Sequence, residues 1–172
     1  MPLPQRLIDG VRREYTIGHL FESSMVDPTT SEERRLLTQV LPPWQRPEVW
    51  TMEQKRRFIE GIFLGLGCGY YVVNGKDWGR DAQPLPMSGW LLDGQQRLCA
   101  LRDFVQNGLV IFTDVTYAGL SLKEQRRFMN EGFPCFELEY TTNENALKEL
   151  YDRLNFGGTP HTLEQRVLPD MP

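Results

Sequence analysis

The feature that most constrains the fold of this chain is the string Leu-Leu-Asp-Gly-Gln-Gln-Arg at residues 91–97. Two apolar residues lead into the Asp-Gly pair, and apolar residues with helical spacing begin at Leu98. An Asp-Gly pair between an apolar run and a helix is typical of a tight turn. We therefore predict a strand that passes through a turn at Gly94 into the N-terminus of a helix.

The residue types of this turn suggest two roles. A helix N-terminus offers backbone N–H groups and the positive end of the helix dipole, which suit a phosphate. The planar guanidinium of Arg97 can bind a phosphate through two hydrogen bonds. Alternatively, Asp93 only caps the helix and accepts hydrogen bonds from its backbone. The turn alone leaves both interpretations open.

The rest of the chain mixes short strands and helices irregularly, which indicates an α+β fold. Strands are predicted over residues 12–17, 36–41, 70–73, 90–92, 109–112, 115–117 and 135–140. Helices are predicted over 18–21, after Thr51 and after Ser121 where capping boxes begin, from Gly94 to about Asn107, and over 143–154. Residues 74–89 form a long loop. We expect one domain over 1–172, with its core at about 14–162 and a frayed tail at 163–172.

Composition excludes several classes of protein. The net charge is −4, so affinity for nucleic acid has to come from a local patch rather than from the whole surface. Cysteines 68, 99 and 135 match neither a disulfide framework nor a zinc site. The apolar stretch at 61–73 is too short and glycine-rich to cross a membrane, and no signal peptide is visible. We expect a cytoplasmic protein, either of a bacterium or of an infected host cell.

Two further polar clusters accompany the central turn. The first is Gln45-Arg46, which lies between prolines that hold it extended, and its alternative is a plain loop in which Trp44 packs on the core. The second is the segment 151–159, where Arg153 and Asn155 precede two glycines; its alternative is an ordinary helix C-terminus. Arginines and amides at three sites are more donors than an apolar interior tolerates without an anion, and a nucleotide or nucleic-acid phosphate is the simplest candidate.

In their order and spacing, the three clusters resemble the ParB-like superfamily, in the branch whose signature is Asp-Gly-Gln-Gln-Arg. That branch includes the S-type subunits of GmrSD restriction systems and the Ssp and Dnd phosphorothioate-linked proteins. The resemblance rests on residues 43–46, 93–98 and 151–160 and spans roughly 14–162. It implies a ParB/sulfiredoxin-like fold, in which a small mixed sheet is flanked by helices.

The resemblance also implies nucleotide-dependent phosphoryl transfer, with an NTP, ATP first, and Mg²⁺. By position, the catalytic residues would be Asp93, Gln96 and Arg97, with Asp93 as base or as the metal ligand. The nucleotide-binding residues would be Gln45, Arg46, Gly94, Gln95, Arg153 and Asn155. The arginines would hold phosphates, and the amides would orient the nucleotide or a water.

We expect a kinase that phosphorylates a hydroxyl on modified DNA, or an NTPase coupled to recognition of modified DNA. The expected partners are DNA and a nucleotide, not a membrane, and a homodimer stays open. The chain has no nuclease motif of the His-Asn-His type, which favours a self-contained enzyme over a subunit acting with a partner in trans. One alternative is a nucleotide- or DNA-binding module without catalysis. Another is sulfiredoxin-like redox chemistry at Cys99, which is disfavoured because Cys99 falls on the expected buried side of its helix.

Overall fold

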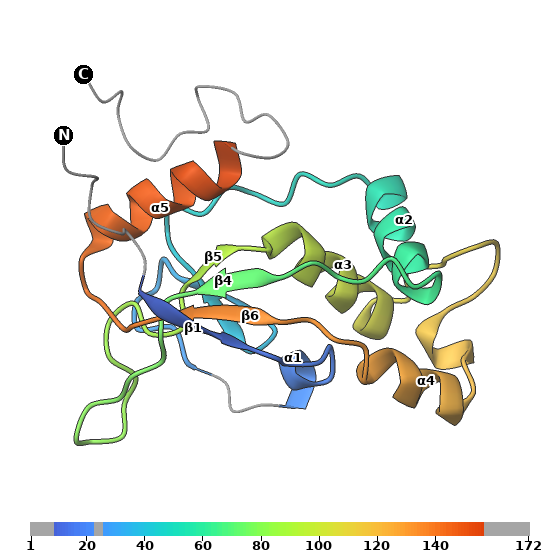
Figure 1. The fold of residues 1–172 in the computed structure, drawn as a ribbon, viewed down its shortest axis with the longest axis horizontal. Helices are drawn as coiled ribbons and strands as arrows, with labels where there is room; N and C mark the ends of the chain where they lie inside the picture. The colour runs from blue at the N-terminus through green and yellow to red at the C-terminus, as the bar shows by residue number, and fades with distance from the viewer. Residues whose placement is uncertain (1–8, 23–25, 157–172) are drawn as a thin grey trace.

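The computed structural model describes residues 9–22 and 26–156 (Figure 1). In chain order, its elements are β1 (Gly10–Arg13), α1 (His19–Glu22), β2 (Arg34–Leu36), β3 (Gln39–Leu41), α2 (Met52–Phe63), β4 (Tyr71–Val73), β5 (Leu91–Asp93), α3 (Gln95–Gln106), a 3₁₀ turn (Tyr117–Gly119), α4 (Leu122–Met129), β6 (Cys135–Leu138) and α5 (Glu144–Phe156). This is the predicted α+β class, a small mixed sheet with flanking helices. None of the described helices is long and apolar enough to cross a bilayer.

The central sheet has the strand order β1-β6-β4-β5. Strand β6 pairs antiparallel with β1 and parallel with β4, and β4 pairs antiparallel with β5. A separate hairpin of β2 and β3 meets the sheet through a parallel bridge between Val40 and Trp90. Strands β4 and β5 are therefore neighbours, although a long loop separates them in the sequence.

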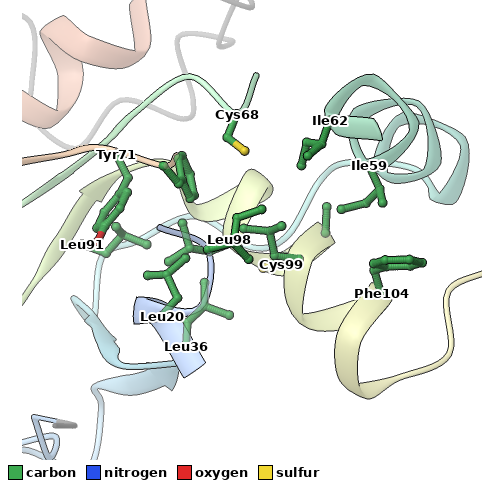
Figure 2. Packing of buried hydrophobic residues seen from close by; sticks show 14 of the residues in the cluster. Leu20, Leu36, Ile59, Ile62, Cys68, Tyr71, Leu91, Leu98, Cys99 and Phe104 are labelled. Atoms are coloured by element: carbon green, nitrogen blue, oxygen red, sulfur yellow. The ribbon is translucent and has the colours of Figure 1, made fainter. Parts of the chain in front are cut away.

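Alternate residues of β4 and β5 enter two hydrophobic clusters, as the two-residue period of a strand requires. Tyr71 and Leu91 belong to the larger cluster, which α2, α3 and α4 also enter. Val72 and Leu92 belong to the smaller one, with Leu147 and other residues of α5. Figure 2 shows part of the larger cluster, where side chains of α3 meet those of α2 and β4. The start of α3 is thus held between the sheet and α2.

The capping boxes explain where α2 and α4 begin. Thr51 accepts a hydrogen bond from the backbone of Gln54, whose side chain accepts one from the backbone of Thr51. Ser121 and Glu124 form the same reciprocal pair at α4. Both predicted helix starts are confirmed, because these signals are local and need no tertiary contact.

Four predicted strands differ from the structure. Residues 36–41 form the turn and second strand of a hairpin rather than one strand, since Leu37 takes a positive φ of 54°. The predicted strands at 109–112 and 115–117 are replaced by an isolated bridge between Ile111 and Val115 and by the start of the 3₁₀ turn at Tyr117. The first strand is Gly10–Arg13 rather than 12–17, with a single bridge at Thr16. The predicted helix stop at Gly157 and the tail at 163–172 lie outside the described residues, and the single domain stays a prediction.

Candidate functional site

A cavity of about 480 Å³ lies where β5 ends and α3 begins. Residues from all three polar clusters line it. The lining residues are Gln45, Arg46, Trp50, Phe58, Gly67, Cys68, Gly69, Leu92, Asp93, Gly94, Gln95, Gln96, Arg97, Leu154 and Asn155. Segments from distant parts of the sequence therefore converge on the predicted turn.

The turn itself requires glycine at position 94. Gly94 has a φ of 101°, and a Cβ added to it would lie 2.6 Å from Cβ of Tyr71. Unlike α2 and α4, α3 has no side-chain cap, since Asp93 makes no capping hydrogen bond. The capped-helix interpretation of Asp93 is therefore wrong. Among the described residues, no side chain accepts a hydrogen bond from the backbone N–H groups in the first turn of α3, as an anion site at a helix N-terminus requires.

Replacing Gly94 with alanine is expected to destabilise the protein by about 2–5 kcal/mol, as positive-φ strain and the contact with Tyr71 add together. Gly108→Ala, at the other end of α3, is the matched control. Gly108 also has a positive φ, 72°, but nothing lies within 4 Å of its added Cβ. Urea unfolding measures the loss in free energy of unfolding for each variant. Equal losses for the two variants would contradict the role of the contact with Tyr71.

Asp93 and Arg97 form an ion pair across the first turn of α3. Arg97 Nη2 donates to Asp93 Oδ2 over 2.7 Å, and each side chain is about a quarter exposed. A Cβ on Gly69 would lie 2.8 Å from Arg97 Nη1, so Gly69 leaves the space that the guanidinium occupies. A cation and a carboxylate thus stand together at the cavity, and both remain accessible to a ligand.

Two adjacent glutamines present opposite hydrogen-bonding atoms. Gln96 Oε1 accepts from the backbone N–H groups of Val49 and Trp50, each over 2.9 Å, which leaves Nε2 as its donor. Gln95 Nε2 donates to the Arg46 carbonyl over 3.1 Å, which leaves Oε1 as its acceptor. Both leftover atoms are buried and have no partner among the described residues. Buried polar atoms without partners are costly, which points to a bound ligand.

The first polar cluster contributes a similar group. Gln45 is 5% exposed, and within the described part of the chain its Oε1 has no hydrogen-bond partner. Arg46 lies beside Tyr151 of α5: burial raises the pKa of the Tyr151 hydroxyl, and the charge of Arg46 opposes that rise. Trp44 packs edge-on against Trp90 and Tyr151, which holds this segment against the core. This packing of Trp44 is what the alternative interpretation, a plain loop, predicted.

The third cluster is only partly brought to the cavity. Asn155 lines it, and its Nδ2 donates to the Tyr151 carbonyl over 2.8 Å. Arg153 is not among the lining residues; its guanidinium is largely exposed and bonds to Glu149 over 2.8 Å. The structure therefore supplies two arginines at the cavity where the sequence predicted three.

The donor set fits a phosphate better than a bare metal ion. Among the described residues no group of three or more His, Cys, Asp or Glu could hold a metal, and Asp93 is the one carboxylate in the lining. Magnesium is commonly held by one or two carboxylates together with substrate phosphates. Asp93 therefore fits Mg²⁺ only when phosphates complete its coordination.

The cysteines do not offer a nucleophile. Burial raises the pKa of Cys68, which lines the cavity, and that of Cys99 to about 12 in each case. Cys99 is 2% exposed and lies outside the lining, so its predicted burial is confirmed. Sequence reasoning missed the wall formed by Trp50, Phe58 and residues 67–69; the alternating glycines at 65, 67 and 69 were its available signal.

The chain matches the family described as the GmrSD restriction endonuclease, N-terminal domain, over residues 26–131. This range is more than half of the chain and includes the first two polar clusters. No curated protein and no solved structure matches the chain.

Proposed function

Because the chain belongs to the family of GmrSD restriction endonuclease N-terminal domains, we propose that it is a nucleotide-dependent component of a restriction system. Its large cavity binds an NTP, with ATP the first candidate, and the NTP is hydrolysed or its γ-phosphoryl group passes to a hydroxyl on DNA. The family supports DNA as the partner, and we propose that this DNA is modified.

The nucleotide proposal is supported by one observation: a single cavity is lined by the uncapped start of α3, two arginines and three glutamines, each with one amide atom that has no partner among the described residues. Its volume of about 480 Å³ lies within the range of roughly 300–1,000 Å³ typical of small-molecule sites. The lining carries two cationic side chains against one carboxylate. This arrangement suits a ligand that combines anionic phosphates with a polar sugar and base.

Phosphoryl transfer depends on positioning and charge neutralisation more than on covalent chemistry. In this proposal the N–H groups of α3, Arg97 and Arg46 hold the phosphates. Gln45, Gln95 and Gln96 orient the nucleotide and the attacking group. Asp93 accepts the proton of the attacking water or hydroxyl, or contributes to Mg²⁺ binding. When bound, Mg²⁺ would neutralise further phosphate charge.

Hydrolysis of the NTP and transfer of its γ-phosphoryl group to DNA give different products. Incubation with a γ-labelled NTP and DNA separates the two: released phosphate indicates an NTPase, and label on DNA indicates a kinase. Absence of both products, in modified and unmodified DNA alike, would contradict either form of the enzyme.

Asp93→Asn is expected to lower turnover by about 10²–10⁴-fold, the usual contribution of a general base, while nucleotide affinity changes little. Phosphate release and titration with a fluorescent NTP measure the two effects. Asp114→Asn is the control, since Asp114 is exposed and lies outside the cavity.

A binding module without catalysis is the second candidate, because the one carboxylate in the lining is already engaged by Arg97. If the protein is such a module, the wild type is expected to bind an NTP saturably without turnover. If Asp93→Asn turns over the NTP as fast as the wild type, Asp93 is not the base.

A further inference from the structure

A second, smaller polar pocket lies under the long loop that joins β4 to β5. Its volume is about 250 Å³, and it shares no lining residue with the nucleotide cavity. Its lining residues are Tyr15, His19, Gln39, Tyr71, Val73, Lys76, Trp78, Cys135 and Glu137. The pocket is therefore built from the segment before α1, α1 itself, the hairpin, two central strands and the loop.

Gln39 brings an unpaired polar atom to this pocket. Its side chain is 2% exposed, and Nε2 bonds to the Thr38 hydroxyl over 3.0 Å, but Oε1 finds no partner among the residues described. If the amide is turned over, the nitrogen becomes the unpaired atom instead. In either orientation one buried amide atom lacks a hydrogen bond, which is costly unless a ligand supplies it.

Lys76 brings the complementary donor. Burial lowers the pKa of Lys76, an effect that the Glu137 carboxylate opposes. Glu137 is itself bonded to Arg13 over 3.1 Å, and across residues 9–22 and 26–156 Lys76 forms no ion pair. The ammonium group is thus partly desolvated and available to donate hydrogen bonds.

The remaining walls are largely aromatic. The rings of Tyr15 and His19 are stacked, with centroids 3.7 Å apart and planes 11° apart. Trp78 is 46% exposed and comes from the loop. Burial and the charge of Lys76 lower the pKa of His19, which favours its neutral form. Flat aromatic surfaces beside one donor and one acceptor suit a planar ring with polar edges.

We propose that this pocket binds a single nucleobase, with Lys76 donating to a ring carbonyl or nitrogen and Gln39 bonding to an amino or imino edge. Proteins that bind unstacked bases use aromatic contacts and hydrogen bonds to the base edge in this way. The volume lies below the roughly 300–1,000 Å³ of sites for larger ligands, so one base fits where a nucleoside triphosphate does not. The base comes from a DNA strand or from a free nucleoside. The inference does not depend on the chemistry proposed for the larger cavity.

Photocrosslinking of the full chain tests the inference. The probes are 5-iododeoxyuridine and 6-thiodeoxyguanosine, each as free nucleoside and within a single-stranded oligonucleotide, and peptide mass spectrometry locates the adducts. We expect adducts on Tyr15 or Trp78. Adducts with the oligonucleotide alone identify a base of DNA, and adducts with both forms identify a pocket for free nucleosides as well.

Two variants test recognition by the polar groups. Lys76→Met and Gln39→Leu are each expected to lower the adduct yield at least about fivefold, whereas Lys123→Met, on the exposed side of α4, leaves it unchanged. If no probe forms adducts at the pocket, or if both variants crosslink like the wild type, the inference is overturned. NTP turnover by the wild type is assayed separately. Turnover without adducts at the pocket refutes the inference about the pocket and leaves the proposed enzyme activity standing. Adducts without turnover refute the proposed enzyme activity and leave the inference about the pocket standing.

Discussion

Replacing Arg97 with alanine is expected to weaken NTP binding by about 100-fold. Hydrogen bonds to charged groups contribute roughly 1.5–3 kcal/mol each, and 1.4 kcal/mol corresponds to a factor of ten. Arg97 stands at the first turn of α3 beside Gly69, where its guanidinium can reach a phosphate held by the helix N-terminus. Titration with a fluorescent NTP measures the change.

Arg97→Lys separates charge from geometry, because lysine keeps the positive charge but loses the planar fork. We expect lysine to recover part of the affinity that alanine loses. Arg57→Ala is the control, since Arg57 is exposed and bonds to Glu53 on α2, away from the cavity. Wild-type affinity in Arg97→Ala, with the fold intact by circular dichroism, would contradict the assignment of Arg97.

Lys55→Met is expected to lower the free energy of unfolding by about 3–5 kcal/mol. Lys55 is buried and forms ion pairs with Glu48 and with Asp103, the second over 2.5 Å. These ion pairs connect α2 to the loop before it, which contains Glu48, and to α3, which contains Asp103. The variant removes one of the two cations that bond to both carboxylates, so Glu48 and Asp103 are left to share Arg102, which bonds to them over 3.2 and 2.8 Å. Urea unfolding measures the loss, and the midpoint of thermal unfolding falls by roughly 6–20 °C for a domain of this size.

Lys123→Met is the matched control, since it removes an exposed lysine and should change stability by less than about 0.5 kcal/mol. Burial alone would raise the pKa of Asp103, but hydrogen bonds from Lys55, Arg102 and Asn107 lower it. The stabilisation is therefore present above about pH 4, the ordinary carboxylate value, and is lost as the pH falls through the lowered pKa. A loss that is the same for both lysine variants would contradict the buried network.

Local signals predicted much of the fold. The capping boxes located α2 and α4, and the Asp-Gly turn located the junction of β5 and α3. The hairpin of β2 and β3 was missed because its turn places Leu37 at positive φ without a glycine or asparagine. Such a turn depends on the packing around it, and its local sequence lacks the residue types that usually indicate a turn.

The candidate site residues were predicted from three short clusters, each recognised from residues that are close in sequence. The turn at 93–97 and the pair Gln45-Arg46 line one cavity, and their roles at a nucleotide stay predictions. Arg153 lies on the exposed face of α5, where it bonds to Glu149 and not to the cavity. Which face of a helix is exposed depends on how the helix packs, and the cluster at 151–159 alone does not show it. The basic run at 55–57 illustrates the same limit: Lys55 bonds to Asp103, which is 48 residues away, while Arg56 and Arg57 bond to Glu53.

In the proposed complex, the start of α3 binds the phosphates of a nucleotide. A crystal structure of the full chain grown with Mg²⁺ and a non-hydrolysable analogue of ATP tests it most directly, with analogues of the other three NTPs in parallel. We expect the phosphates to lie against the backbone N–H groups of residues 95–97 and the guanidinium of Arg97. A nucleotide bound elsewhere, or no binding of any of the four analogues, would contradict it.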